Sequence, residues 1–504
     1  MAAGLPNSRL SGAGAPMYRL AAIVLAIAVA SCAPVRHDPV PGDSLEAIES
    51  ELAADIAVLA SDGFEGRRPG TEGEAKTLRY LAQQWQTAGL ESGTNDPANP
   101  WFAPVALQLN TPSRSDAEFF RGRRRIAMPD GAVHLYTSGR RSLLERSPMV
   151  FVGREGEALD RSELAGRVAV MLWSHPRRLE QREALLEGAA AVLAIVPDDT
   201  GLTELVDRRA EGSYRLLSAE DGAQLDGFVS RQGAEALIGA ERLAALLAAA
   251  EEPDFKPVPL HIEARLEAVS LSREVRTHNL IARLPGKRPD AGAVLLLAHW
   301  DHFGRCGEGE GATAICNGAI DNASGLAVLG AVAKRLAQGP PLDRDVYFLA
   351  TTAEEWGLLG ARAFAQDPPV PLDTIVAAFN LDTIAVAPRG GPVALVGYGM
   401  TPLDAEVERV VTNLGRPLGD HDYANRYVRR QDGWALLQHD VPALMVSSAF
   451  ADREALESYM GSRYHRTSDI AGEIELGGAA EDVLLHIALV QHFANLASYP
   501  AAVP

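Results

Sequence analysis

The sequence has few cysteines, no excess of basic residues and no long hydrophobic run. Three cysteines in 504 residues are too few for a disulfide framework or a set of zinc fingers. The formal net charge of −19 argues against a nucleic-acid-binding protein, because phosphate groups attract clustered Lys and Arg side chains. The sequence also lacks internal repeats and low-complexity segments. What remains is the composition of an ordinary globular protein, with 47% hydrophobic and 22% charged residues.

The N-terminus carries an apolar run from Leu20 to Val29, which is shorter than a bilayer-spanning helix and follows Arg19. This pattern predicts a signal peptide over residues 1–32. The tetrapeptide that ends at Cys32 resembles the lipobox of bacterial lipoproteins, in which Cys32 would be lipidated and become the mature N-terminus. The alternative is an ordinary cleaved signal with a chance cysteine. We expect an exported cell-envelope lipoprotein, periplasmic or anchored in the outer membrane, with a Pro-rich tether over 33–44.

The first part of the chain after the tether combines helices with a turn-rich loop. Apolar residues recur at helical spacing from Leu45 to Ala60 and again from about Glu74 to Gly89. The loop between them, SDGFEGRRPGTEGE, is either a connector or part of the rim of a site. After Trp101, short alternating runs predict β-strands.

The region from about Ser147 to Leu260 has a self-contained β–α–β pattern. It contains no pairing of acidic residues with histidine, which indicates a folded module without chemistry of its own. From His278 onward, strand-like runs of Val, Leu and Ile alternate with helical stretches. Such runs are buried on both faces, so the sequence predicts an α/β fold with a mixed, mostly parallel sheet sandwiched by helices.

Polar side chains follow these strands where each strand ends, and in open α/β sheets ligands bind at that edge. The coincidence predicts a metal site there, because independent surface carboxylates would scatter over both edges. The candidate residues are His299, Asp301, Asp321, Glu354, Glu355, Asp382 and His465.

The candidate residues have ligand chemistry that suits a pair of zinc ions. Two Zn²⁺ ions would be neutralised by the carboxylates of Asp321, Glu355 and Asp382 together with one hydroxide, while histidines act as neutral donors. Asp301 lies two residues after His299, so we expect its carboxylate to accept the other imidazole N–H. Of the adjacent glutamates, one would hold metal and the other would act as general base.

Five motifs, HWDH, GAIDNASG, TTAEEWGLLG, NLDT and YHRTSD, resemble in order and spacing the di-zinc aminopeptidase family of aminopeptidase Y and bacterial leucyl aminopeptidases. The loop GRRPGTEGE fits this family as well. The resemblance implies a zinc-exopeptidase fold, of the phosphorylase/hydrolase-like type, and peptide substrates. The expected activity is removal of N-terminal residues, with a metal-bound hydroxide as nucleophile and a glutamate as general base.

The resemblance also implies a role for each site residue. Asp321 would bridge two zinc ions, one held by His299 and Asp382 and the other by Glu355 and His465. Glu354 would be the general base, and Asp301 would accept a hydrogen bond from the imidazole of His299. Tyr464, beside His465, would either polarise the scissile carbonyl or serve packing.

The β–α–β module resembles the protease-associated domain, with a VFVG strand and a helix that ends at Gly188-Ala189. We therefore expect a catalytic domain in two parts, residues 45–135 and 263–504, with a β-rich protease-associated domain inserted over 136–262. One departure concerns the substrate pocket. Where members often carry Arg-Ser-Asp-His, this chain has Arg430, Gln431, Asp432 and Gly433.

Two alternatives to an aminopeptidase share the resemblance. A glutaminyl cyclase would use one zinc ion, and a receptor-like member would lack catalysis; the complete ligand set and GAIDNASG disfavour both. We further expect a disulfide between Cys306 and Cys316, in the loop between the His299 strand and Asp321, because an exported protein meets oxidising conditions. The alternative for these cysteines is two free thiols.

Overall fold

The computed structural model describes residues 44–154, 161–174, 178–219, 223–252, 254–306 and 314–500. The predicted signal peptide, the lipidation site Cys32 and nearly all of the tether lie outside these residues. The described residues from Ile48 onward form one compact unit. No helix in the described ranges is both long and apolar enough to cross a membrane.

A sheet of parallel strands forms the core of the C-terminal region, which confirms the predicted α/β fold. Its strands follow the order β16-β17-β15-β11-β14-β10. The four central strands pair in parallel and are buried along their whole length, whereas β10 and β16 pair antiparallel at the two sides. The strands are β10 (Val258–Leu284), β11 (Ala293–His299), β14 (Asp345–Thr351), β15 (Ile375–Asn380), β16 (Ala394–Val396) and β17 (Ala443–Ser447).

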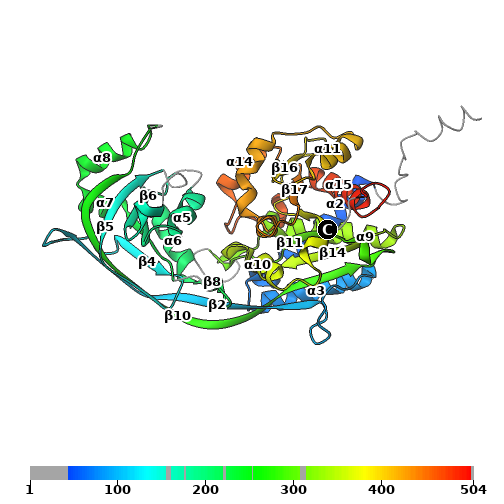
Figure 1. The fold of residues 1–504 in the computed structure, drawn as a ribbon, viewed down its shortest axis with the longest axis horizontal. Helices are drawn as coiled ribbons and strands as arrows, with labels where there is room; N and C mark the ends of the chain where they lie inside the picture. Colours follow the sequence, from blue (N-terminus) through cyan, green and yellow to red (C-terminus); the bar gives the residue numbers. More distant parts are fainter. Residues whose placement is uncertain are drawn as a thin grey trace, which may run out of the picture. The chain divides into compact units, whose positions relative to one another are not determined.

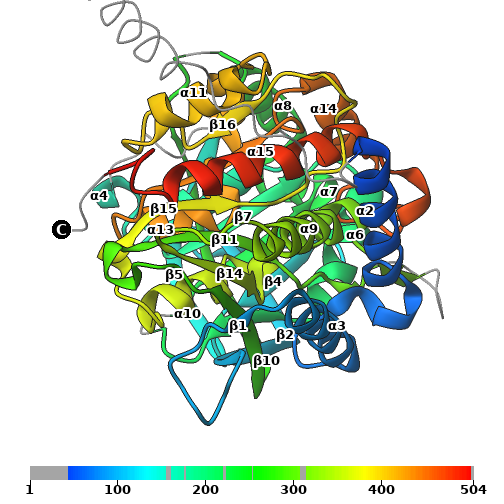
Figure 2. The ribbon, with the colours of Figure 1, turned by 90° about the vertical axis from the view of Figure 1, so that its right-hand side faces the viewer.

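Helices cover both faces of this sheet because successive strand residues point to opposite faces. Leu295 and Leu297 of β11 share a hydrophobic cluster with α10 (Leu359–Gln366) and α13 (Gly433–Leu437). On the other face, Phe348 packs against Trp85 of α3 (Glu72–Ala88), and Phe379 packs against Phe493 of α15 (Gly477–Phe493). Helix α9 (Gly325–Gln338) lies on the same face, between α3 and α15 (Figure 2).

The remaining elements of this region connect the core strands. Helix α11 packs on α15, and α12 packs on β16. Their bounds, with those of the other short elements, are α2 (Leu45–Leu59), β1 (Glu91–Ser92), β12 (Gly304–Arg305), β13 (Ile315–Cys316), α11 (Asp404–Asn413), α12 (His421–Ala424) and α14 (Arg453–Ser462).

A second group of strands carries the predicted β–α–β pattern. Strands β5, β6, β7 and β9 pair in parallel, and β4 closes the group antiparallel to β9. The predicted boundaries 136–262 stay a prediction, because the structure joins the strands of this group and those of the parallel core in one continuous sheet. The elements are β4 (Val133–Thr137), β5 (Arg141–Gly153), α4 (Arg161–Leu164), β6 (Val168–Leu172), α5 (Arg178–Leu186), β7 (Ala191–Val196), α6 (Asp199–Ala210), β9 (Leu225–Ser230), α7 (Arg231–Ile238) and α8 (Ala240–Ala249).

Two long strands connect this group, which we call the module, to the parallel core (Figure 1). Strand β2 (Phe102–Arg121) pairs antiparallel with β10 along nearly its whole length. The N-terminal half of β10 also pairs with β5 of the module, and its C-terminal end pairs with β14. The sequence predicted short strands here, because polar residues interrupt the alternation that marks a strand. Two short strands, β3 (Arg124–Ile126) and β8 (Ser213–Leu216), pair with β2.

Candidate metal centre

The predicted metal ligands gather at the carboxyl edge of the parallel strands. His299 ends β11, and the adjacent glutamates form a short 3-10 helix, Glu354–Trp356, after β14. Asp382 follows β15 by two residues, and Asp321 lies in the helical turn Ala319–Ser324 that leads into α9. His465 arrives from the segment after α14. The structure therefore brings all five predicted metal ligands together at the edge where ligands bind in open α/β sheets.

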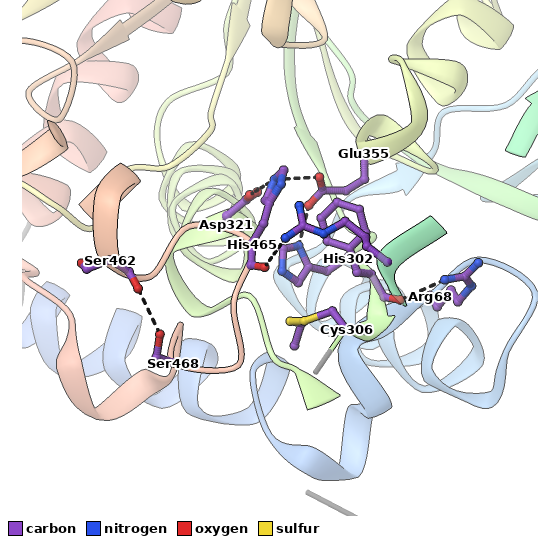
Figure 3. The surroundings of a disulfide bond; sticks show 11 residues. Arg68, His302, Cys306, Asp321, Glu355, Ser462, His465 and Ser468 are labelled. Carbon is purple, nitrogen blue, oxygen red and sulfur yellow. Dashed lines mark hydrogen bonds and ion pairs between the residues drawn. A yellow bond between two sulfur atoms is a disulfide. The ribbon is translucent and has the colours of Figure 1, made fainter. Parts of the chain in front are cut away.

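Asp321 lies between two sets of donor atoms, as expected for a bridging carboxylate. Its Oδ1 atom is 3.2 Å from Nε2 of His299, and its Oδ2 atom is 3.2 Å from Nε2 of His465 (Figure 3). The Asp321 side chain is almost completely buried. One carboxylate thus faces an imidazole on each side.

The first donor set surrounds His299. Its Nε2 atom lies 3.6 Å from Oδ1 of Asp382 and 4.0 Å from Oε2 of Glu354. His299, Asp321 and Asp382 are buried and present ligand atoms close enough to share one ion.

The second donor set surrounds Glu355. Its Oε2 atom is 3.0 Å from Nε2 of His465, and its Oε1 atom is 2.5 Å from Nδ1 of His302. Because Glu354 faces His299 while Glu355 faces the other histidines, the two adjacent side chains diverge as predicted.

His302 is the residue of this cluster that the sequence reasoning missed. It is fully buried and, with Asp321 and Glu355, forms a second group able to hold a metal ion. The signal was present, since His302 ends the motif HWDH three residues after His299. Both His302 and His465 thus contact the carboxylate predicted to hold the second ion.

The structure corrects the predicted role of Asp301. Nδ1 of His299 lies 3.2 Å from the backbone carbonyl oxygen of Asp301, and the nearer carboxylate oxygen is 3.9 Å away. The carboxylate instead accepts the backbone N–H of Glu354 at 3.0 Å and that of Glu355 at 3.4 Å. The tight turn after β11 brings the carbonyl to the imidazole and sends the side chain toward the neighbouring strand end.

The loop GRRPGTEGE takes part in the site, which decides between the two alternatives left open for it. Arg67 is fully buried and donates to the carbonyl oxygens of Trp300 at 2.9 Å, Asn317 at 2.6 Å and Gly318 at 3.0 Å. These carbonyls flank the chain segments that carry His299 and Asp321. Burial lowers the pKa of Arg67 to about 10, while nearby carboxylates, that of Asp321 first, act in the opposite direction.

The carboxylates give the site a strongly negative potential. Burial alone would lower the pKa of His299, but the charge of Glu354 and the nearby carboxylates of Asp321 and Asp382 raise it well above its usual value. Burial, reinforced by the charges of Asp382 and Glu355, raises the pKa of Glu354 well above that of an ordinary glutamate. Such a potential attracts cations, and a raised pKa suits a carboxylate that accepts a proton.

The cluster fits divalent cations. Nε2 of His299, His302 and His465 is buried in each case, without a hydrogen-bond partner among the described residues. Buried polar nitrogens normally find a partner. Imidazole nitrogens and carboxylate oxygens aimed at the same point are the donor set that zinc prefers.

A cavity that is partly open to solvent lies beside Asp321, Glu354 and Asp382. Tyr464 reaches it; its ring stacks on His465 with centroids 3.6 Å apart, and its hydroxyl accepts a hydrogen bond from Arg430 at 3.1 Å. Both alternatives for Tyr464, packing and contact with substrate, agree with this position. The other lining residues are Thr383, Tyr427, Gln431, Met445, Phe450 and Met460.

Gln431 fills the space at the position where the family pattern departs. A β-carbon placed on Gly433 would lie 2.7 Å from Oε1 of Gln431, and that oxygen accepts the Gly433 N–H at 2.7 Å. A side chain at residue 433 would therefore displace the end of the Gln431 side chain. The adjacent Asp432 is buried and accepts a hydrogen bond from the Thr351 hydroxyl.

The disulfide predicted near this site is present. Cys306 and Cys316 are bonded, and Cys306 lies close to the cluster of His302, Glu355 and His465 (Figure 3). The bond joins the two short strands β12 and β13, whose Gly304 and Cys316 pair directly.

Comparison with known proteins shows which proteins the chain is similar to around this site. Residues 279–488 match the family model of peptidase family M28. The chain is similar in structure to an aminopeptidase from Aneurinibacillus sp. strain AM-1, with 18% identity, a TM-score of 0.54 and coverage of 89% of this chain and 94% of that one. It is also similar to a zinc aminopeptidase from Bacillus subtilis, with 16% identity, a TM-score of 0.50 and coverage of 89% and 95%.

A curated relative shares a shorter segment. The vacuolar membrane protease of Yarrowia lipolytica is 37% identical over 94 residues, which are 18% of this chain and 8% of that protein's length. At their low identities the two structures show a common fold, and the family match covers every predicted metal ligand from His299 to His465.

Proposed function

We propose, from the match of residues 279–488 to the model of peptidase family M28, that this chain is a peptide hydrolase and specifically a two-zinc aminopeptidase. The match to a peptidase family supports hydrolysis of peptides. The number of ions and the removal of single N-terminal residues are our proposal.

The position of Asp321 is the observation that carries the proposal. Its two carboxylate oxygens each lie 3.2 Å from a different histidine, which is what a carboxylate shared by two ions requires. His299 and Asp382 would hold one ion. Glu355, His465 and His302 would hold the other. Zinc bound here would act as a Lewis acid on the peptide carbonyl and on a water molecule.

Glu354 is the residue best placed to accept a proton. It lies beside His299 and Asp382, lines the cavity and is itself outside the two candidate ligand groups. Its raised pKa makes it a stronger base than an exposed glutamate, which suits removal of a proton from the attacking water.

Carboxylates at the mouth of the cavity would recognise the free α-amine of a peptide. Asp382 and Glu354 line the cavity, and an α-ammonium group pairs well with such acceptors. Tyr464, whose ring stacks on that of His465 and which lines the same cavity, would contact the first peptide carbonyl. The cavity itself would take the side chain of the N-terminal residue.

The experiment compares a free peptide with its N-acetylated twin, using mass spectrometry and protein loaded with zinc. We expect residues to be lost one at a time from the free peptide alone, because acetylation removes the charge of the amine. Protein treated with a chelator is the control and should cleave neither. Internal cuts, or equal cleavage of both peptides, would contradict an exopeptidase.

The same assay separates the two alternatives. A peptide with N-terminal glutamine would lose ammonia without hydrolysis if the chain were a glutaminyl cyclase. A receptor-like protein would leave every peptide intact.

We also propose export and lipid anchoring at Cys32, as the sequence around it indicates. Labelling of cells with a radioactive fatty acid should mark the wild-type protein and leave the Cys32→Ser variant unlabelled. The module would then be a protease-associated domain that restricts the cleft to peptides. A shift of cleavage toward folded proteins after deletion of the module would support this role, provided that the deleted form still folds.

A further inference from the structure

The module contacts the metal centre directly through the last turn of α6. Two consecutive arginines there point in different directions. Arg209 pairs with the buried Asp226 and lies 4.7 Å from the ring centroid of Tyr136, both inside the module. Arg208 leaves the module and donates from Nη2 to the backbone carbonyl oxygen of His465 at 3.3 Å. A residue from the module thus holds the backbone of a candidate metal ligand.

A layer of aromatic rings supports this contact. The guanidinium of Arg208 lies 5.6 Å from the ring centroid of Phe303, and the Phe303 ring packs edge-on against His465 at 4.6 Å. Phe303 also contacts the ring of His302 at 5.1 Å. Arg208 and Phe303 therefore join α6 to both histidines that face Glu355.

A second arginine ties the module to the same phenylalanine. Arg68 donates to the carbonyl oxygen of Phe303 at 3.2 Å and to that of Glu211, just after α6, at 2.8 Å (Figure 3). Its guanidinium lies 5.2 Å from the rings of Tyr214 and Trp356, and Tyr214 donates to Pro69 at 2.8 Å. The end of α6 is therefore held against the metal centre by contacts independent of Arg208.

The backbone of His465 needs such support. Its φ angle is +58°, in the left-handed region that non-glycine residues adopt at a cost of about 1–3 kcal/mol when strained. A conformation of this kind persists only where the surroundings fix it. Arg208 supplies the hydrogen bond to the His465 carbonyl within the described part of the chain, so its loss would free the backbone that aims the imidazole at Asp321 and Glu355.

We propose that the module completes the second metal position, with Arg208 as a positioning residue that fixes His465 and thereby sets how tightly that position binds zinc. The proposal rests on the two-zinc function proposed above and assigns the module a role beyond controlling entry. It also gives a reason why Arg208 contacts His465, whereas the neighbouring Arg209 pairs with Asp226 inside the module.

The charge of Arg208 acts on the same position. Burial lowers its pKa, and the nearby carboxylate of Glu355 opposes this effect. A partly buried guanidinium near Glu355 would help to balance the carboxylate cluster whether or not zinc is bound. Lysine at this position would keep the charge but lose the planar group that reaches the carbonyl over Phe303.

The experiment measures zinc retention of the full chain during dialysis against a graded series of chelator concentrations. The variants are Arg208→Ala, Arg208→Lys and, as matched control on the exposed side of the same helix, Asp207→Ala. We expect Arg208→Ala to lose one of two zinc ions at about 10- to 100-fold lower chelator strength than wild type, as loss of a ligand's hydrogen-bond partner does elsewhere. Arg208→Lys should be intermediate, and Asp207→Ala should match wild type.

Cobalt substitution gives a second readout that does not depend on turnover. The visible spectrum of the second cobalt ion should change in Arg208→Ala, because the imidazole of His465 is reoriented, and it should be unchanged in Asp207→Ala. Thermal unfolding of the metal-free proteins checks that Arg208→Ala is folded; if it is not, the comparison of Arg208→Lys with wild type decides.

The outcomes separate this proposal from the proposed function. Equal zinc retention and equal cobalt spectra in Arg208→Ala and wild type would overturn the role of Arg208 and leave the aminopeptidase proposal intact. Weakened binding in a protein that cleaves no peptide would support the role of Arg208 and overturn the aminopeptidase. A wild-type chain that binds fewer than two ions would overturn both.

Discussion

The carboxylate of Asp301 accepts the backbone N–H of Glu354 at 3.0 Å, across two neighbouring strand ends. Asp301 follows β11 and Glu354 follows β14, so this bond fixes the candidate base relative to His299. Burial raises the pKa of Asp301 to about 7, although the charge of His299 acts in the opposite direction. The residue is therefore a positioning element of the Glu354 turn, and its substitution should affect the two glutamates.

Asp301→Asn should lower both zinc affinity and turnover, each by about 10- to 100-fold. The amide keeps one acceptor oxygen but turns an NH2 group toward the second of two backbone N–H groups. Zinc titration and steady-state kinetics measure the two effects. Asp290→Asn, an exposed acidic residue before the same strand, is the control and should behave as wild type. Normal kinetics in Asp301→Asn would disprove the positioning role.

Glu354→Gln should retain both zinc ions and lose turnover by about 10²- to 10⁴-fold, because it removes a proton acceptor and no ligand. Glu355→Gln should instead lower zinc occupancy, since Glu355 faces His465 and His302. Elemental analysis and single-turnover assays of the two variants test the contrast. A near-normal rate in Glu354→Gln with full zinc content would refute its assignment as base.

His302→Ala should weaken the second metal position by about 10- to 100-fold. His302 is fully buried and its Nδ1 atom lies 2.5 Å from Glu355, so it either binds the ion or orients the glutamate that does. Zinc retention against a chelator is the measurement. The exposed His439 provides the control variant His439→Ala. If both variants keep zinc equally well, His302 serves only packing.

The Cys306–Cys316 disulfide should leave at most the thiol of Cys32 reactive in denatured, unreduced protein. Thiol counting with a chromogenic disulfide tests this directly, and two further reactive thiols would contradict the bond. Replacing both cysteines with serine should cost about 2–3 kcal/mol of unfolding free energy, because the closed loop is short. Chemical denaturation of the zinc-free protein measures that loss without interference from metal binding.

His486→Leu should make the fold less sensitive to acid. Burial lowers the pKa of His486 from 6.5 to about 4, so the unfolded chain binds more protons than the folded one between these values. Stability from this residue is present above pH 6.5 and is lost as the pH falls toward 4. The wild type should therefore lose on the order of 3 kcal/mol more than the variant between pH 7 and pH 4.

Denaturant titrations at several pH values measure this difference on zinc-free protein. Burial raises the pKa of Asp482 to about 6, so this residue changes the pH dependence of stability in the opposite direction. Asp482 is present in both proteins, so its contribution cancels in the comparison. An equal loss of stability in the two proteins would show that His486 is protonated or solvated in the folded state.

The residues at the strand ends could be predicted, because in the sequence several apolar runs that predict strands are followed by residues that can bind a metal ion. Near-continuous apolar strands such as Ala293–His299 can be buried only between helices, and their carboxyl ends meet at one edge. His299, Asp321 and Asp382 could therefore be grouped without coordinates. The pairing of Cys306 with Cys316 followed from their place in one loop.

Contacts that depend on backbone direction were decided only by the tertiary structure. Sequence spacing allowed the Asp301 side chain to reach His299, but the turn directs it to Glu354. His302 belongs to the cluster because the same turn folds it back toward Glu355, which no periodicity reveals. Strands β2 and β10 are long because they pair with each other, which satisfies the hydrogen-bonding groups of their backbones. The pattern of apolar and polar side chains does not reveal such pairing.

The sequence by itself determined the kind of chemistry at this site, because ligand type and strand-end position are local properties of the chain. The tertiary structure decided which atoms face each other and which distant segments support them. Arg67 and Arg208 act on the site through hydrogen bonds to carbonyl oxygens of Gly318 and His465, far along the chain. A backbone carbonyl is common to every residue, so its partner leaves no mark in the sequence and is chosen by folding alone.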